Sequence, residues 1–219
     1  MVSILRDLKG ANRPKLLDLF CKAGGASVGY YRAGFEVEGV DIEPQPHYPF
    51  KFYLADALDF PLEGFDAYHA SPPCQRWSAA FNPIYGRGDS PDLIGGIRER
   101  FLAVAKPYVI ENVYKAPLRA TLMLCGTMFG LDVIRHRFFE MYPNSLFSPF
   151  TCSHIKKTAR QGYAPIPGKE YHVVTGHLSD IANARKAMGI DWMLAREIVE
   201  AIPPAYTEYI GKYLLQTTE

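Results

Sequence analysis

Short apolar segments alternate with segments of helical pattern, and this alternation constrains the fold more than any other feature of the chain. The apolar segments predict strands at residues 15–20, 35–42, 52–54, 65–70, 108–111 and 138–141. The helical pattern covers residues 27–32, 91–105, 118–129, 179–188, 194–201 and 203–215. Strands and helices that alternate at this spacing predict an α/β fold with a doubly wound, mostly parallel sheet.

Polar or glycine residues follow several of these predicted strands. They are Gly24, Gly25, Asp41, Asp56, Cys74 and Glu111. In open α/β sheets, ligands bind beyond the carboxyl ends of the strands. The coincidence of polar groups with strand ends therefore predicts an enzyme.

Composition favours one globular domain. The 219 residues are 48% hydrophobic and 21% charged, a balance that suits a single well-filled core. We expect a catalytic domain of residues 1–141 and 177–219, interrupted by a small irregular insertion at 142–176. No apolar run approaches the ~18–20 residues that span a bilayer. Residues 1–14 lack the apolar stretch of a secretory signal, so we expect a cytoplasmic protein without a membrane partner.

The net charge of +1 hides an uneven distribution. Residues 36–66 carry eight acidic residues and one lysine, whereas residues 135–169 carry six basic residues and one glutamate. Such polarity can present a basic face to a polyanion, although a merely solvated surface explains it equally well. The four cysteines are too few and too scattered for a disulfide scaffold.

The glycine turn after the first strand indicates a particular class of cofactor. Residues 23–25 read A-G-G, which is neither the G-x-G-x-x-G of dinucleotide folds nor a phosphate loop. A nucleoside cofactor without phosphates suits such a turn, with Asp41 accepting from a ribose diol and Asp56 from an adenine amine. S-adenosylmethionine fits these residues better than NAD, although a purely structural turn is equally compatible with them.

A second segment carries a candidate nucleophile. Pro72 and Pro73 stiffen the turn that presents the thiol of Cys74 at the carboxyl edge of the sheet. Glu111 ends the following strand, so its carboxylate is expected beside that thiol. The alternatives are a packed cysteine and a glutamate that only caps a helix.

Five motifs in these regions resemble those of the cytosine-C5 DNA methyltransferases, in the order of that family. They read D-L-F-C-K-A-G-G at 18–25, S-P-P-C-Q at 71–75, V-I-E-N-V at 109–113, R-H-R at 135–137 and A-I-P-P at 201–204 with I-G at 210–211. The resemblance implies a Rossmann-like fold of the S-adenosylmethionine-dependent methyltransferase type. It covers residues 15–141 and 196–214.

The resemblance also implies a mechanism. A thiolate at Cys74 adds to carbon 6 of cytosine and makes carbon 5 nucleophilic enough to take a methyl group. Glu111 protonates the ring N3 and Arg137 holds the O2 oxygen, while we expect Arg137 to lower the pKa of Cys74. Arg135 supports this group or reaches a phosphate. The base must be flipped out of the duplex, and residues 78–91 are expected to form a mobile loop over it.

The implied contacts complete the expected site. Cofactor contacts are expected at Phe20, Gly24, Gly25, Asp41, Ile42, Asp56, Ala57 and Pro72. DNA contacts are expected at Gln75, Ser78, Phe81, Arg87, Lys156, Lys157 and Arg160. The expected partner is double-stranded DNA, in the nucleoid of a bacterial or phage-infected cell. A monomer is expected, and an oligomer is the alternative. Small members of the family carried by bacteriophages are similar in size, and there methylation protects DNA from restriction.

The chain departs from the family pattern at several places. Lys22 and Glu200 replace a glycine and an amide, and the recognition insertion is short, which predicts a short or degenerate target of about two to four base pairs. Cys152 and His154 lack a second pair at ligand spacing, so no metal is predicted. A tRNA substrate and a non-catalytic relic that binds cofactor or DNA remain the alternatives. A nicotinamide oxidoreductase is disfavoured because G-x-G-x-x-G is missing.

Overall fold

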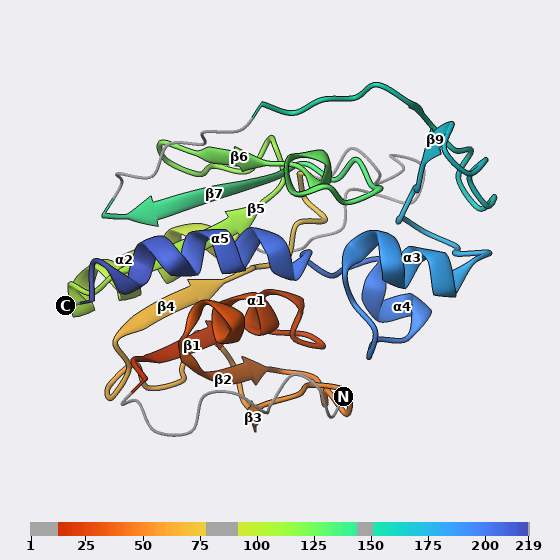
Figure 1. Cartoon of the computed structure of the whole chain (residues 1–219). Coiled ribbons are helices and arrows are strands. Elements are labelled where there is room, and N and C mark those ends of the chain that lie inside the picture. Colours follow the sequence, from red (N-terminus) through yellow and green to blue (C-terminus); the bar gives the residue numbers. More distant parts are fainter. Residues whose placement is uncertain (1–12, 78–91, 144–150, 219) are drawn as a thin grey trace.

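The computed structural model describes residues 13–77, 92–143 and 151–218. Within them, one sheet of seven strands has the order β3-β2-β1-β4-β5-β7-β6 (Figure 1). The strands are β1 Lys15–Leu19, β2 Glu36–Asp41, β3 Lys51–Leu54, β4 Ala67–Ala70, β5 Tyr108–Asn112, β6 Leu122–Leu124 and β7 Arg137–Tyr142. The first five are parallel, and β7 pairs antiparallel with both β5 and β6, so β7 alone of these seven strands runs in the opposite direction. The predicted mostly parallel α/β sheet is confirmed.

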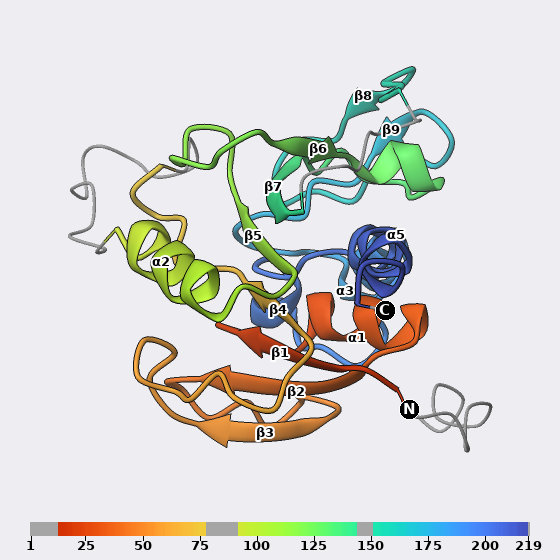
Figure 2. The ribbon, with the colours of Figure 1, turned by 90° about the vertical axis from the view of Figure 1, so that its left-hand side faces the viewer.

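Helices cover both faces of the sheet, as Figure 2 shows. Helices α1 (Gly25–Ala33) and α5 (Pro204–Leu215) pack on one face, and α2 (Ile94–Val104) packs on the other. The first two approach closely because Gly29 has no side chain: a Cβ there would lie 2.0 Å from Oγ1 of Thr207. This contact fixes the C-terminal segment against the first helix, and so brings residues 199–202 to the start of α1.

The helix predicted at residues 118–129 is wrong. The chain forms strand β6 and then a 3-10 helix at Gly126–Phe129. Leu122 and Leu124 are buried on the sheet, and pairing with β7 supplies hydrogen-bond partners for one side of the backbone of β6. At residue 126 a Cβ would lie 2.3 Å from the carbonyl oxygen of Val133, so glycine is needed for the turn.

The insertion is less irregular than predicted. Strands β8 (Lys157–Thr158) and β9 (Glu170–Tyr171) form a small parallel sheet, and an isolated bridge joins Val133 to His172. Helices α3 (Ile181–Met188) and α4 (Ala195–Ile198) follow, the second shorter than predicted. All four elements lie beyond the carboxyl ends of the parallel strands (Figure 1). No helix in the described ranges has the length and apolar character needed to cross a membrane.

Candidate active site

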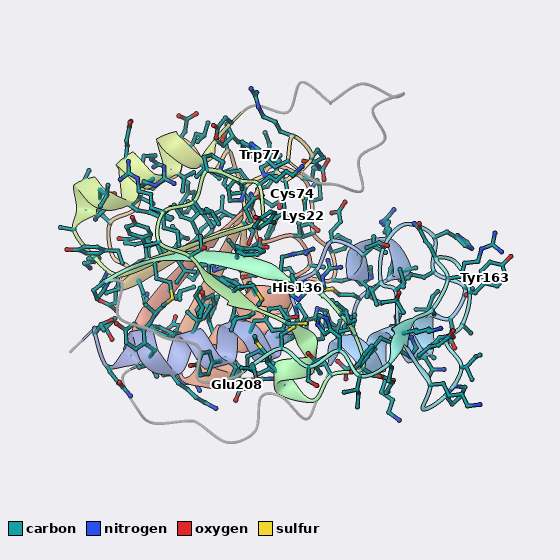
Figure 3. The ribbon with its side chains drawn as sticks, turned by 90° about the horizontal axis from the view of Figure 1, so that it is seen from above. Lys22, Cys74, Trp77, His136, Tyr163 and Glu208 are labelled. Atoms are coloured by element: carbon teal, nitrogen blue, oxygen red, sulfur yellow. The ribbon has the colours of Figure 1, made fainter. Side chains whose placement is uncertain are left out.

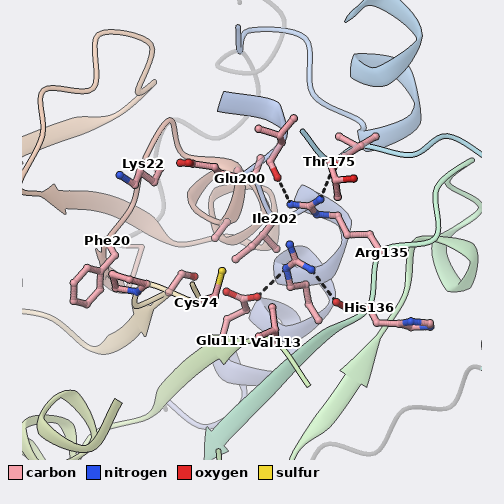
Figure 4. Close-up of a pocket in the computed structure, with 18 of the residues that line it drawn as sticks. Phe20, Lys22, Cys74, Glu111, Val113, Arg135, His136, Thr175, Glu200 and Ile202 are labelled. Carbon is pink, nitrogen blue, oxygen red and sulfur yellow. Dashed lines mark hydrogen bonds and ion pairs between the residues drawn. The ribbon is translucent and has the colours of Figure 1, made fainter. Parts of the chain in front are cut away.

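A cavity of about 700 Å³ opens at the carboxyl ends of β1, β4 and β5 (Figure 4). It is closed on the other side by residues 133–138, 173–176 and 199–202. The predicted site residues on its wall are Phe20, Gly25, Pro72, Cys74, Gln75, Glu111, Arg135 and Arg137. The fold therefore brings together residues of all five motifs, up to about 180 residues apart in the sequence, at the edge where ligands bind α/β sheets.

The turn that carries Cys74 is anchored by the neighbouring strand. Nδ2 of Asn112, at the end of β5, donates to the carbonyl oxygen of Pro72 at 2.9 Å. The backbone N–H of Trp77 donates to the carbonyl of Cys74 at 3.0 Å, which closes the turn on its other side. Cys74 itself is only half-buried. Its thiol is thus held on a rigid support at the cavity wall.

Burial, followed by the charge of Glu111, raises the pKa of the Cys74 thiol. Arg137 and Arg135 act in the opposite direction, as predicted for Arg137, but they do not outweigh these two effects. The expectation of a lowered pKa is therefore wrong for the protein alone. The physical reason is that a partly desolvated thiolate beside a carboxylate is disfavoured more than two cations favour it.

Glu111 and Arg137 form an ion pair beside this thiol. Oε1 of Glu111 lies 3.1 Å from Nε of Arg137, and Nη1 of the arginine donates to the carbonyl of His136 at 2.9 Å (Figure 4). Burial raises the pKa of Glu111, although both arginines and Ser71 oppose the shift. A raised pKa favours the protonated form of the carboxyl group, which is the form that can donate a proton.

Arg135 is buried and holds the cavity together. Its guanidinium donates to the carbonyl oxygens of Val174 and Val199, at 2.9 and 2.8 Å. Burial lowers its pKa to about 9. Because both terminal nitrogens bind backbone oxygens on two separate segments, this side chain joins residues 174 and 199 across the cavity. Its role toward a substrate stays a prediction.

The glycine turn has the strained backbone that a close approach requires. Gly24 has φ +83°, and a Cβ at Gly25 would lie 2.5 Å from the carbonyl oxygen of Ile202. Phe20 and Lys22 also have positive φ values, of 59° and 45°. Lys22 therefore occupies a left-handed conformation in which glycine is favoured.

Several predicted cofactor residues lie outside the cavity wall. Asp41 accepts backbone N–H bonds from Lys22 and Glu43, each at 3.0 Å, and so fixes the turn. Asp56 is exposed and accepts from the backbone of Leu58 at 2.8 Å. The others are Gly24, the exposed Ile42 and the buried Ala57. Their contacts with a cofactor stay predictions.

The predicted DNA contacts are spread over different parts of the chain. Ser78, Phe81 and Arg87 lie outside the described residues, as does the rest of the predicted loop. Gln75 is exposed at the rim of the cavity.

The predicted basic DNA contacts differ in whether their charge is paired with an acidic side chain. Lys156 is paired with Asp132 at 2.6 Å, whereas Lys157 is exposed on β8. The guanidinium of Arg160 lies over the ring of Tyr163, 4.9 Å from its centroid. Figure 3 places Tyr163 at one end of the molecule, away from Cys74.

Asp18 is a site residue that the sequence reasoning missed. It lies in β1, is 1% exposed and lines the cavity. The hydroxyl of Ser27 donates to Oδ2, while Oδ1 has no hydrogen-bond partner among the described residues. Burial raises the pKa of Asp18 to about 7. The available signal was one acid within an otherwise apolar buried strand, K-L-L-D-L.

Comparison with known proteins identifies the fold. No protein-family model and no curated protein matches the sequence. Among solved structures, a protein encoded within an E. coli prophage and described as a DNA modification methyltransferase matches with a TM-score of 0.69. Its sequence is 14% identical, and the match covers 93% of this chain and 99% of that one. The chain has a methyltransferase fold.

Two further structures agree with this result. The S. pombe Dnmt2 methyltransferase matches with a TM-score of 0.63 at 12% identity, over 94% of this chain and 99% of that one. The Entamoeba histolytica methyltransferase EhMeth matches with a TM-score of 0.57 at 10% identity, over 95% and 100%. At these identities the likeness concerns the fold, which is the Rossmann-like type of the S-adenosylmethionine-dependent methyltransferases.

Proposed function

We propose that the protein transfers a methyl group from S-adenosylmethionine to carbon 5 of cytosine in DNA. The observation that carries the proposal is that Cys74, Glu111 and Arg137 all line the cavity, with Glu111 and Arg137 in an ion pair. A nucleophile, a proton donor and an oxygen-binding cation are the three groups that activation of a cytosine ring needs. A relic that only binds cofactor or DNA needs none of them in this arrangement.

The residues present fit the cofactor. Oδ1 of Asp18 is a buried carboxylate oxygen without a hydrogen-bond partner among the described residues, and it suits a cationic or N–H group of a bound molecule. Gly25 lets the chain turn without a side chain between β1 and residue 202. Phe20 and Pro72 supply apolar surface for an adenosine. When bound, S-adenosylmethionine supplies an electrophilic methyl group on its sulfonium.

The residues of this chain would activate the base in a defined order. The sulfur of Cys74 forms a bond to carbon 6, and the ring electrons move toward N3 and O2. Glu111 gives its proton to N3, and Arg137 donates hydrogen bonds to O2. After carbon 5 has been methylated, its proton passes to solvent and the electron pair restores the double bond between carbons 5 and 6. Cys74 then leaves as a thiolate, and N3 returns its proton to Glu111.

The raised pKa values of Cys74 and Glu111 are compatible with this chemistry because the two groups are coupled. A protonated Glu111 carries no charge, so it no longer opposes ionisation of the thiol. The same protonated form is the one that can donate to N3. The state that favours the nucleophile is therefore also the state that supplies the acid.

Methyl transfer and acceptor are tested together. The protein is incubated with labelled S-adenosylmethionine and duplex DNA, tRNA or no acceptor, and the modified bases are mapped. Label at carbon 5 of cytosine in DNA supports the proposal. Label in tRNA alone would change the substrate class, and no label with any acceptor would favour a non-catalytic protein.

The nucleophile is tested by a trapping experiment. DNA that contains 5-fluorocytosine should hold the wild-type protein covalently, because fluorine cannot leave as the proton does. Cys74→Ser should lose the adduct, since a hydroxyl without a dedicated base is a weak nucleophile. Cys21→Ser is the matched control, because Cys21 is the other thiol on the cavity wall. An adduct that depends on Cys21 would refute the assignment.

Contacts with DNA phosphates are proposed for the exposed cations of the insertion. Lys157 and Arg160 are exposed, whereas Lys156 is already paired with Asp132. Lys157→Ala with Arg160→Ala should weaken binding to all duplexes alike and reduce the salt dependence of the affinity by about two phosphate contacts. Lys212→Ala, on the outer part of α5, is the control. An unchanged salt dependence would contradict this role.

A further inference from the structure

Four side chains with metal-binding atoms converge beside the cavity. Cys125 follows β6, His136 lies between the two site arginines, and Cys152 and His154 lie at the start of the described part of the insertion. One ligand atom from each of them lies within 4.8 Å of the other three. The sequence predicts no metal at Cys152 and His154 because a second pair is missing at ligand spacing. The tertiary structure supplies that pair from two other segments.

The distances within the cluster are close to those of a metal site. The Cys125 sulfur lies 3.4 Å from Nε2 of His154, and the Cys152 sulfur lies 3.2 Å from Nε2 of His136. Tetrahedral zinc with ordinary bond lengths places neighbouring sulfur and nitrogen ligands about 3.5 Å apart. The Cys152 sulfur and Nε2 of His154 are closer, at 2.7 Å. Binding of zinc would require these two atoms to move apart by roughly 0.8 Å.

We propose that Cys125, His136, Cys152 and His154 bind one zinc ion. Two thiolates and two imidazoles form a Cys2His2 set, which zinc binds tetrahedrally in structural sites. Four protein ligands leave no open position for water, so the ion has a structural role and takes no part in the transfer of a methyl group.

The surroundings of the ligands support the assignment. Cys125 is fully buried, and the hydroxyl of Thr127 lies 3.5 Å from its sulfur, as an outer hydrogen bond to a thiolate would. The phenol of Tyr171 donates to the carbonyl of Ser153 at 3.2 Å and so fixes the turn between the second cysteine and the second histidine. Contacts that do not involve the ion thus hold two of the three segments that carry the ligands.

The position of His136 gives the ion a consequence for the cavity. The backbone carbonyl of this residue accepts from Arg137, whose Nε pairs with Glu111. The ion would join residues 136–137 to Cys125 and, in the insertion, to Cys152 and His154. It would therefore fix Arg137 relative to the insertion. This consequence rests on the proposed function, whereas the zinc site itself does not.

The site is tested first by metal content. The full chain, purified without chelators and without metal-affinity chromatography, should contain about one zinc ion per chain when measured by inductively coupled plasma mass spectrometry. Cobalt added to chelator-stripped protein should give the intense visible bands of tetrahedral cobalt and a sulfur-to-metal charge-transfer band. Protein that carries no zinc and gives no such bands would overturn the proposal. A disulfide between Cys125 and Cys152 in freshly isolated protein would also overturn it.

Variants separate loss of a ligand from loss of the fold. His154→Ala should weaken zinc binding strongly. Loss of an outer hydrogen-bonding partner typically lowers metal affinity by about 10- to 100-fold, and loss of a ligand should lower it by more. His154→Cys keeps a ligand at the position and should retain the ion. His177→Ala, an exposed histidine outside the cluster, is the control and should keep full metal content. Equal metal content in the alanine variant and the control would refute the assignment, whether or not the protein methylates DNA.

Discussion

Replacement of Asp18 by asparagine should stabilise the protein while it weakens cofactor binding. The native carboxyl group is 1% exposed, and its pKa rises from 3.8 to about 7 because burial disfavours the charge. The asparagine keeps an oxygen that can accept from Ser27, but it places an amide where Oδ1 now lies. The substitution therefore removes a buried charge and adds a buried donor.

The size of the effect follows from the pKa of Asp18. The folded state holds its proton up to about pH 7, whereas the unfolded chain releases it near pH 4, so stability falls as pH rises between these values. A shift of about three units corresponds to about 4 kcal/mol once the pH is above 7. An unsatisfied amide costs about 1–3 kcal/mol at every pH. Asp18→Asn should thus gain about 1–3 kcal/mol at pH 8.

The pH dependence is the sharper part of this prediction. Between pH 5 and pH 8 the advantage of Asp18→Asn over the wild type should grow by about 3 kcal/mol, whatever the amide costs. Urea unfolding followed by circular dichroism at the two pH values measures it. Asp59→Asn, at an exposed aspartate, is the control and should change stability by less than about 0.5 kcal/mol at both. An advantage that does not grow with pH would refute the buried charge at Asp18.

The same variant tests the proposed cofactor site. Calorimetric titration with S-adenosylmethionine should show weaker binding to Asp18→Asn, by roughly tenfold or more, because a charge-assisted hydrogen bond contributes about 1.5–3 kcal/mol. A variant that is more stable at pH 8 but binds the cofactor as well as the wild type would support a buried charge at Asp18. It would refute the proposed contact between Asp18 and the cofactor.

Three other predictions concern the site and its support. The rate of alkylation of Cys74 should rise with pH, with an apparent pKa above that of a free thiol. Glu111→Gln should lower that pKa because it removes a nearby negative charge. The same rate profile in both proteins would exclude an effect of Glu111 on the thiol. Glu140→Gln should cost about 3–5 kcal/mol in urea unfolding, because it leaves the buried Arg98, now 2.7 Å from the carboxylate, without its counter-ion. Glu200→Asn removes an exposed acid from the cavity wall. Calorimetry should show that S-adenosylmethionine binds this variant more tightly by roughly two- to tenfold, which is about 1 kcal/mol. Weaker binding would mean that the acid favours the cofactor.

Most of the parallel sheet could be predicted because its signals are local. Parallel strands such as β1 and β4 are mostly buried and mostly apolar, and the glycines and prolines that follow them mark the turns. The error at residues 118–129 shows the limit of such signals. A three-residue strand has no period of its own, and the pairing partner that decides its conformation, β7, comes more than ten residues later.

The sequence by itself determined the alternation of strands and helices and the order of the motifs along the chain, because these depend on residue type and short spacing. Only the tertiary structure decided their electrostatics: burial and the proximity of Glu111 raise the pKa of Cys74, although the sequence predicts the opposite. It also decided which side chains meet. Arg135 binds the carbonyl of Val199, 64 residues away, and Cys125 meets His154, 29 residues away. Contacts over such separations depend on how the elements pack, which no local pattern encodes.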